Sequence, residues 1–341
     1  MTGGAGFIGS HLVDALLAAG AARVVIFDNF LRGTRENIKA AMDDPRTTCF
    51  ESEADLLDVE ATHSACEGMD GVFHLASLCL GHCQDDPRKG YDINVTGTFN
   101  ILEASGANDV KRVMCASSSS VYGNAVYTPM DEDHPFMNQN FYGATKIAGE
   151  AIVNAFHHTH GLDYLNFRFM NVYGPRQDYE GAYVAVIIKA IDRILQGLPP
   201  IIYGDGSQVR DWLYVEDHAR ALYEVITKGQ AGETYNIGGN NEKKNIEVVE
   251  YICDLLDELA PSKLDGIESY SELITFVEDR PGHDQRYAID SSKIKKELGW
   301  KPTVNFEEGL RETVKWYLDN KEWWERVLSG DYALDRLGLD N

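Results

Sequence analysis

The chain has 341 residues, of which 31 are basic and 54 acidic, so its formal net charge is −23. This balance excludes a nucleic-acid-binding protein, which needs a basic surface, and argues against binding to an anionic membrane. No apolar run approaches the roughly 20 residues that span a bilayer, and the N-terminus lacks the basic region of a secretory signal. The length predicts two lobes around one or two cores.

Alternating helices and strands are predicted for the first half of the chain. Apolar residues recur at helical spacing over 10–20, and Gly20 ends this helix. A buried strand follows at 23–27 and ends at Asp28. Further strands are predicted at 71–75, 110–116 and 164–169. This order predicts an α/β fold, with a Rossmann-type doubly wound parallel sheet.

The pattern changes after Gly174, where a smaller mixed α/β C-terminal substrate domain is predicted. Its expected helices cover 183–196, 217–228, 246–259, 291–298 and 306–327. The last helix carries aromatic side chains that we expect to serve packing: Trp316, Tyr317, Trp323 and Trp324. We therefore divide the chain into a dinucleotide-binding domain at 1–168, with returning segments near 208–235, a mainly substrate-binding domain at 169–328, and a tail at 329–341.

The six cysteines include no CxxC pair. Reduced thiols in a cytoplasmic protein are the expected state. Cys79, His82 and Cys83 lie close together in sequence, but no second ligand pair with the spacing of a zinc finger follows them. We therefore expect no metal.

A glycine loop opens the chain. Gly3, Gly6 and Gly9 permit a tight turn, a close approach of the backbone to a pyrophosphate, and close helix packing. Asp28 follows about 20 residues later at a strand end, where a carboxylate accepts hydrogen bonds from ribose hydroxyls and repels a 2′-phosphate. This favours NAD over NADP, although Arg32 and Arg35 lie close by and keep NADP open.

The strand that normally precedes such a loop is missing, because only Met1 and Thr2 come before Gly3. We expect this to leave the two neighbouring strands unpaired, at a cost in stability and cofactor affinity, and we suspect a truncation or a misplaced start.

Tyr142 and Lys146 are the predicted catalytic pair, since residues at i and i+4 share one face of a helix. A lysine ammonium one turn away would favour the phenolate of a tyrosine whose ordinary pKa is near 10. Ser118, within a serine run after an apolar strand, is the predicted catalytic hydroxyl.

These residues resemble the extended short-chain dehydrogenase/reductase family, and within it the nucleotide-sugar epimerases and dehydratases. The resemblance covers about residues 2–327. The matching motifs are 3–9, 28–29, 55–56, 74–76, 94–98, 117–123, 142–146, 168–175, 203–206 and 280–282.

The resemblance implies a cofactor site, a substrate site and a partner. The cofactor, NAD, would contact Gly3, Gly6, Phe7, Ile8, Gly9, Asp28, Asn29, Asp55, Leu56, Leu75, Ala76, Asn94, Tyr142 and Lys146. A nucleotide-diphosphate sugar would contact Ser119, Ser120, Asn171, Arg210 and Arg280. The family also implies a homodimer through helices near 92–106 and 142–158.

Two subfamilies compete for the reaction. The segments 209–218 and 280–284 look like those of nucleotide-glucose 4,6-dehydratases, which carry an Asp-Glu pair after the catalytic hydroxyl. Ser119 and Ser120 stand at those positions, and serine cannot supply a proton-transfer group of suitable pKa. We therefore predict an isomerase, an NAD-dependent 4-epimerase of a UDP-hexose or UDP-hexuronate type acting through a transient 4-keto sugar. A 4,6-dehydratase with an unrecognised acid, or a non-catalytic NAD-binding scaffold, remains the alternative.

Overall fold

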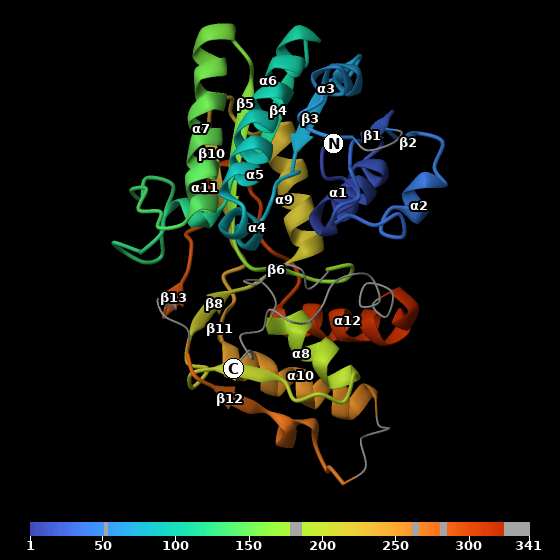
Figure 1. The fold of residues 1–341 in the computed structure, drawn as a ribbon, viewed down its shortest axis with the longest axis vertical. Helices are drawn as coiled ribbons and strands as arrows, with labels where there is room; N and C mark the ends of the chain where they lie inside the picture. The colour runs from blue at the N-terminus through green and yellow to red at the C-terminus, as the bar shows by residue number, and fades with distance from the viewer. Residues whose placement is uncertain (51–53, 178–185, 261–265, 280–284, 324–341) are drawn as a thin grey trace.

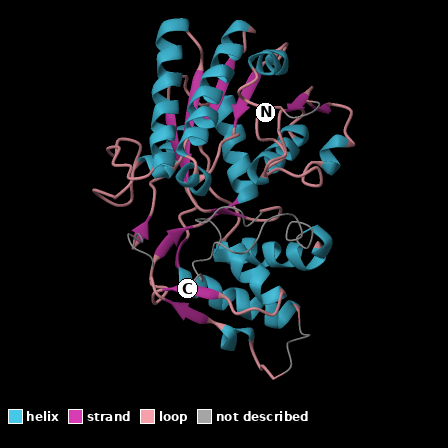
Figure 2. Ribbon diagram, viewed as in Figure 1, coloured by secondary structure: helices cyan, strands magenta, loops and turns pink. Residues whose placement is uncertain are grey.

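The computed structural model describes residues 1–50, 54–177, 186–260, 266–279 and 285–323. A parallel sheet with helices on both faces forms one lobe, and a smaller lobe of short strands and helices lies below it in the view of Figure 1. The colouring by secondary structure in Figure 2 shows the same two lobes. Among the described residues, no helix combines the length and the apolar character needed to cross a membrane.

Four strands of the first lobe pair in parallel, in the order β10-β5-β4-β3, and two more form the parallel pair β1-β2. Their bounds are Val24–Ile26 (β1), Thr47–Cys49 (β2), Gly71–His74 (β3), Arg112–Ala116 (β4), Tyr164–Phe169 (β5) and Thr234–Ile237 (β10). The predicted strands at 23–27, 71–75, 110–116 and 164–169 are therefore present, and the predicted fold class is confirmed.

Residues 1–3 lie between β1 and β3, where the expected strand is missing. The Met1 ammonium donates to the Val25 carbonyl at 2.6 Å, and the Gly3 amide donates to the Phe27 carbonyl at 2.9 Å. On the other side, the Thr2 amide donates to the Phe73 carbonyl at 2.9 Å. The expectation of unpaired neighbouring strands is therefore wrong at this end of the sheet, because three residues suffice to join β1 to β3 where the glycine loop begins.

Helices cover both faces of this sheet. Alternate residues of a strand point to opposite faces, so Met114 packs with α1 and α9, whereas the adjacent Val113 packs with α3, α6 and α7. These helices are Phe7–Ala18 (α1), Val59–Cys66 (α3), Gly97–Ala107 (α6), Phe141–His160 (α7) and Val215–Lys228 (α9). Shorter helical segments are Lys39–Met42 (α2), Leu80–Asp85 (α4), Pro87–Tyr91 (α5), the π-helical turn Asp92–Thr96 (η1), the 3₁₀ turn Ser119–Val121 (η2) and Ser292–Leu298 (α11).

Among the described residues, the smaller lobe is built from three small sheets, three α-helices and one 3₁₀ turn around Trp212, Ile252 and Leu310. β8 pairs with β11 in antiparallel and with β13 in parallel orientation, while β7 pairs with β12 and β6 with β9. The strands are Val172–Tyr173 (β6), Ile201–Tyr203 (β7), Val209–Asp211 (β8), Leu213–Tyr214 (β9), Glu242–Lys244 (β11), Thr275–Val277 (β12) and Arg286–Tyr287 (β13). The helices are Val186–Leu195 (α8), Asn245–Leu259 (α10), the 3₁₀ turn Tyr270–Leu273 (η3) and Phe306–Asp319 (α12).

The last predicted helix, 306–327, is interrupted at Asn320 in the structure, with helical residues again at 321–323. α12 ends at Asp319, and Asn320 follows as its C-cap; residues 324–327 of the prediction lie outside the described residues, as does Trp324. Tyr317 and Trp323 are buried, with ring centroids 6.1 Å apart. These aromatic side chains serve packing, as expected.

Candidate active site

The glycine loop lies between the end of β1 and the end of β3 and leads into α1. Gly3 has a φ of +71°, and a Cβ on Gly9 would lie 2.1 Å from the Gly3 carbonyl oxygen. Gly6 caps α1, whose first turn has no side-chain cap and no acidic residue, and which begins with Phe7 and Ile8. Helix N-termini left open in this way accept anionic groups, so the loop fits a pyrophosphate.

Asp28 lies beside this loop and is buried. Its carboxylate accepts hydrogen bonds from the Ala5 amide at 2.8 Å and the Phe30 amide at 2.9 Å. Burial raises the pKa of Asp28, and both hydrogen bonds act in the opposite direction. Each carboxylate oxygen keeps a second lone pair for a ribose hydroxyl. The neighbouring Asn29 is exposed, and its side chain accepts from the Leu31 amide.

The remaining predicted cofactor residues lie around the same strand ends. The Ala76 amide, next to Leu75, donates to the Thr2 hydroxyl at 3.2 Å. Asp55 is half-buried, but the Leu56 side chain packs against Gly97 of α6 in the core. The Asn94 side chain hydrogen-bonds Leu78 and Thr145.

Ser118, Tyr142 and Lys146 come together at the carboxyl end of β4. Ser118 hydrogen-bonds the Tyr142 hydroxyl. Burial raises the pKa of this hydroxyl to about 12, although the hydrogen bond acts in the lowering direction. The Lys146 ammonium donates to the Ala116 carbonyl at 2.9 Å and lies 5.6 Å from the centroid of the Tyr142 ring. Burial lowers the pKa of Lys146 to about 8.

The expected effect of Lys146 on Tyr142 is therefore not the dominant one. Burial raises the pKa of the Tyr142 hydroxyl, and the nearby charge that lowers it is that of Arg32. The reason is geometric, because the Lys146 ammonium is directed at the Ala116 carbonyl, which lies at the end of β4.

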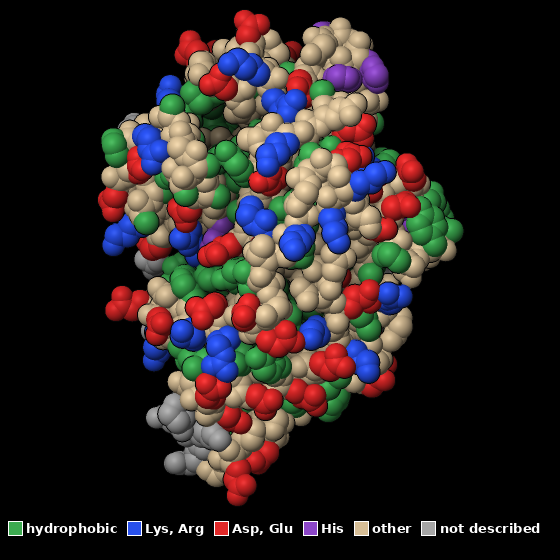
Figure 3. Space-filling model, turned by 180° about the vertical axis from the view of Figure 1, so that it is seen from behind, with side chains coloured by type: hydrophobic (Ala, Val, Ile, Leu, Met, Phe, Trp, Pro, Cys, Tyr) green, Lys and Arg blue, Asp and Glu red, His purple; other side chains and the backbone are tan. Residues whose placement is uncertain are grey.

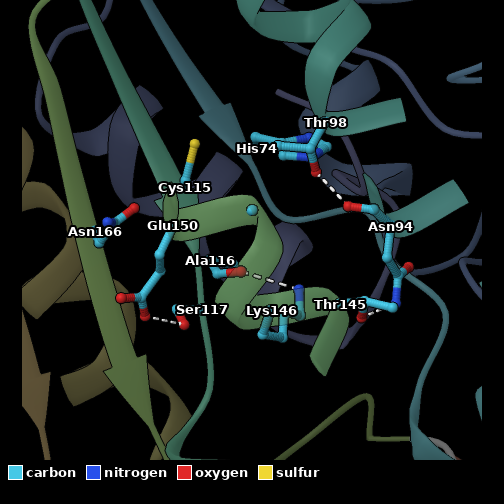
Figure 4. A pocket seen from close by; sticks show the side chains of 11 residues that line it. His74, Asn94, Thr98, Cys115, Ala116, Ser117, Thr145, Lys146, Glu150 and Asn166 are labelled. Carbon is cyan, nitrogen blue, oxygen red and sulfur yellow. Dashed lines mark hydrogen bonds between the residues drawn. The ribbon is translucent and has the colours of Figure 1, made fainter. Parts of the chain in front are cut away.

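A small pocket lies behind Lys146 on the side of β4 and β5 (Figure 4). Glu150 forms an ion pair with Arg168 at 2.7 Å and accepts a hydrogen bond from Ser117 in this pocket. His74, on the opposite side, bonds the hydroxyls of Thr2 and Thr98, and burial lowers its pKa to about 3. These polar side chains already have hydrogen-bond or ion-pair partners in the protein, so we assign them the role of packing around Lys146.

The predicted substrate residues differ in their burial and in their hydrogen-bond partners. Ser119 is buried, and its carbonyl accepts from the Tyr287 hydroxyl at 2.7 Å; Ser120 is half-buried, and its hydroxyl accepts from Ser118 at 3.2 Å. Asn171 has a φ of +40°, and its buried Nδ2 has no hydrogen-bond partner among the described residues. An amide donor held in this way fits a phosphate oxygen.

The two arginines complete the predicted substrate set. Arg210 is half-buried on β8 and donates to the Val209 carbonyl at 2.8 Å. Arg280 lies outside the described residues.

Sequence reasoning missed two features of this region. Cys79 Sγ hydrogen-bonds His82 Nδ1 at 3.1 Å, and Asn94, in the π-helical turn η1, bonds Leu78 and Thr145. The Cys-x-x-His spacing was visible but was weighed only as a metal motif. No group of three or more histidine, cysteine or acidic side chains able to hold a metal ion occurs in the described part of the chain.

Charge on the surface agrees with the composition. Acidic and basic side chains intermingle on the face shown in Figure 3.

Comparisons with known proteins identify relatives over nearly the whole chain. The family model described as GDP-mannose 4,6 dehydratase matches residues 1–313. A dTDP-glucose 4,6-dehydratase of Neisseria meningitidis serogroup B is 44% identical, over 99% of this chain and 98% of its own.

Solved structures of both subfamilies are similar to this chain. DesIV, a dTDP-glucose 4,6-dehydratase from Streptomyces venezuelae solved with NAD bound, has a TM-score of 0.85 at 34% identity, with 96% of this chain and 98% of its own covered. A UDP-glucose 4-epimerase from Thermotoga maritima, solved with UDP-glucose, has a TM-score of 0.82 at 31% identity, with 93% of this chain and 97% of its own covered. The predicted cofactor, NAD, is confirmed at the level of these relatives, and the glycine loop and Asp28 fit it.

The prediction of a 4-epimerase, and with it of an isomerase, is wrong. The relative at 44% identity is named a dehydratase, which is a lyase, whereas the epimerase reaches 31%. The prediction gave two side chains, Ser119 and Ser120, more weight than the dehydratase-like segments 209–218 and 280–284. The likeness extends over the whole chain, and so this chain belongs to the family of NAD-dependent nucleotide-sugar epimerases and dehydratases, within the extended short-chain dehydrogenases/reductases.

Proposed function

We propose that this chain is an NAD-dependent nucleotide-diphosphate-glucose 4,6-dehydratase, a lyase that removes water from dTDP-glucose to give a 4-keto-6-deoxy sugar. The observation that carries the proposal is the 44% identity, over 99% of the chain, to a protein named for this reaction. The joining of Ser118, Tyr142 and Lys146 at one strand end supports it, because a non-catalytic scaffold does not require a serine and a tyrosine hydrogen-bonded beside a half-buried lysine.

Tyr142 is the group that removes the proton from the sugar O4. Ser118 holds O4 through its hydroxyl and lowers the pKa of Tyr142, and the Arg32 charge acts in the same direction. The glycine loop and Asp28 would hold NAD, which would supply a hydride acceptor for C4 and a hydride donor for C6 within one cycle, so that no external reductant would be consumed. Lys146, whose ammonium donates to the Ala116 carbonyl, would also bond the nicotinamide ribose.

The cofactor and the substrate are held by different parts of the chain. The cofactor residues are the glycine loop, Asp28 and the ends of β1 and β3. Asn171, Arg210 and Arg280 bind the diphosphate, and the partnerless Asn171 Nδ2 supports this role. Local arginines suit a strongly acidic protein, since the long-range field repels the anionic substrate and nearby cations must hold it.

The test is the mass of the product formed from dTDP-glucose in the presence of NAD. We expect a product lighter by one water from the wild type. Tyr142→Phe, which keeps the ring and removes the hydroxyl, should lower the rate by about 100-fold or more, while NAD binding stays intact. Unchanged turnover by Tyr142→Phe would contradict the role of the hydroxyl, and a wild type that removes no water would contradict the function.

A homodimer through α6 and α7 completes the proposal. The two helices lie side by side at one edge of the larger lobe (Figure 1). Phe99 of α6 is 42% exposed and packs edge-on against Phe156 of α7 at 5.4 Å. An exposed aromatic ring that packs on a half-buried one of the neighbouring helix suits a helical interface. Light scattering should show a dimer for the wild type and a monomer for Phe99→Lys, and a wild-type monomer would contradict the interface.

The proposed domain division follows the prediction: dinucleotide binding by residues 1–168 with segments near 208–235, and substrate binding mainly by 169–328. The returning segments are supported by α9, which packs on the parallel sheet, and by β10, which pairs with β5 within it. We also propose a cytoplasmic location, supported by six free cysteines, because thiols persist in reducing compartments.

A further inference from the structure

The glycine loop is held from behind by the segment that follows β1. The Ala5 amide donates to the Asp28 carboxylate at 2.8 Å. The Ala5 carbonyl accepts hydrogen bonds from the Thr34 amide at 3.1 Å and from Asn37 Nδ2 at 3.0 Å. A Cβ on Gly33 would lie 2.8 Å from the Ala5 carbonyl carbon, so the two segments are in close contact. Asn37, which is 5% exposed, therefore binds the loop with a buried side chain.

The bond on the Ala5 carbonyl also sets the shape of the loop. This carbonyl and the Gly6 amide belong to one peptide unit, which is planar, so fixing one of them fixes the direction of the other. The Gly6 amide donates to the Gly3 carbonyl at 3.2 Å and closes the turn that leads into α1. Glycine backbones are free to adopt many conformations. A loop built from them binds a pyrophosphate more tightly when its bound conformation is fixed in advance.

Asn37 is bonded in turn by a side chain from the core of the smaller lobe. The Trp323 indole donates from Nε1 to Asn37 Oδ1 at 3.1 Å, and Trp323 is 8% exposed. The same ring packs edge-on against Trp316, with centroids 5.0 Å apart. Because an indole N–H can only donate, the Asn37 oxygen faces Trp323 and its amide nitrogen faces the Ala5 carbonyl. The bonds therefore run in one direction, from Trp323 through Asn37 to Ala5.

The helix after the loop is held by other contacts. On α1, His11 Nε2 bonds the Pro175 carbonyl at 3.0 Å, and Asp14 pairs with Arg176 at 2.8 Å. These contacts involve neither Asn37 nor Trp323. Removing the indole donor or the Asn37 amide would therefore release the glycine loop while α1 keeps its position.

We propose that Asn37 is a positioning residue for NAD, and that Trp323 acts on the glycine loop through it. The two side chains fix the Ala5 carbonyl, and with it the turn from Gly3 to Gly6, before the pyrophosphate binds. The affinity for NAD then depends on a tryptophan that lies 286 residues from Asn37 in sequence, in the substrate-binding part of the chain. This inference goes beyond the proposed reaction, since it concerns the binding of the cofactor and no step of the sugar chemistry.

The test is calorimetry of NAD binding to the whole chain, freed of bound nucleotide. Asn37→Ala should weaken NAD binding by about tenfold, because a buried hydrogen bond to the loop is lost. Trp323→Phe keeps an aromatic ring and removes the indole donor, and it should weaken NAD binding by about threefold. The double variant should lose about tenfold, as Asn37→Ala does alone, because Trp323 acts through Asn37.

Two comparisons separate positioning from general damage to the fold. Adenosine keeps the ribose that Asp28 would bond and lacks the pyrophosphate, so the three variants should bind it as the wild type does. Trp316→Phe makes the same substitution in the neighbouring ring and should bind NAD normally. Urea denaturation shows which variants fold, and Trp323→Phe carries the test if Asn37→Ala does not fold.

The assignment would be overturned by NAD binding to Asn37→Ala within about twofold of the wild type. Equal losses of affinity for NAD and adenosine, or an equal loss in Trp316→Phe, would show a structural role only. Losses that multiply in the double variant would show that Trp323 does not act through Asn37. A failure of the proposed function looks different, since the wild type would then bind NAD but remove no water from dTDP-glucose.

Discussion

His218 offers a quantitative test of how the core of the larger lobe is built. The ring lies on α9, fully buried, with its centroid 4.8 Å from that of Phe169 and 5.9 Å from that of Phe167. Neither ring nitrogen has a hydrogen-bond partner among the described residues. Burial lowers the pKa of His218 to about 3, so the folded protein keeps this ring neutral in mild acid.

The stability that His218 contributes therefore depends on pH in a known direction. The pKa of His218 in the folded state is lower than its unfolded value of about 6.5. Between these two values the unfolded chain binds a proton at His218 and the folded protein does not, so stability falls as pH drops from about 6.5 towards 3. At pH 5 the proton stabilises the unfolded state by about 2 kcal/mol relative to neutral pH. His11 and His74 act in the same direction, whereas Asp211, whose pKa burial raises to about 6, opposes them.

The assay is urea denaturation at pH 7 and pH 5 for the wild type and His218→Leu. The wild type should lose about 2 kcal/mol more stability between the two pH values than the variant, because the other groups titrate in both proteins and cancel. His160→Leu, at an exposed position, is the control and should behave as the wild type. Equal losses in the wild type and His218→Leu would refute the buried, neutral imidazole.

Three further predictions concern the cofactor site and the ion pair behind Lys146. Gly9→Ala should abolish NAD binding in calorimetry, since its Cβ would overlap the Gly3 carbonyl oxygen at 2.1 Å. Asp28→Asn should weaken NAD binding by about tenfold, because the asparagine side chain has one acceptor oxygen for the two backbone amides that bond Asp28. It should also narrow the preference for NAD over NADP, because the negative charge is lost. Glu150→Gln should cost about 3–5 kcal/mol in urea denaturation by leaving Arg168 without its charge partner, and an unchanged midpoint would contradict this pairing.

The repeating parts of the fold could be predicted from the sequence. β3, β4 and β5 follow apolar runs, and α1 and α9 follow helical periodicity, because burial of one face imposes a regular pattern. The short pairing of residues 1–3 could not be predicted, since two residues before a glycine carry no strand pattern. α12 ends earlier than predicted because Asn320 leaves the helical conformation, and the aromatic residues continue beyond it.

The site shows the same limit. The glycine loop, Asp28, Ser118, Tyr142 and Lys146 could be found from motifs because backbone geometry fixes their spacing. The Asn94 clamp on Leu78 and the Cys79–His82 bond depend on how η1 and α4 pack on α7, which no local pattern reports. The predicted reaction was wrong for a related reason. Ser119 and Ser120 form only one part of the site, and they do not show which groups other segments supply.

The central claim is the reaction, and proton NMR of the product from dTDP-glucose and NAD tests it most directly. A 4,6-dehydratase gives a new methyl doublet from C6, with a keto group at C4 and its hydrate in water. A galacto-configured anomeric signal with C6 intact would contradict the account and would indicate a 4-epimerase.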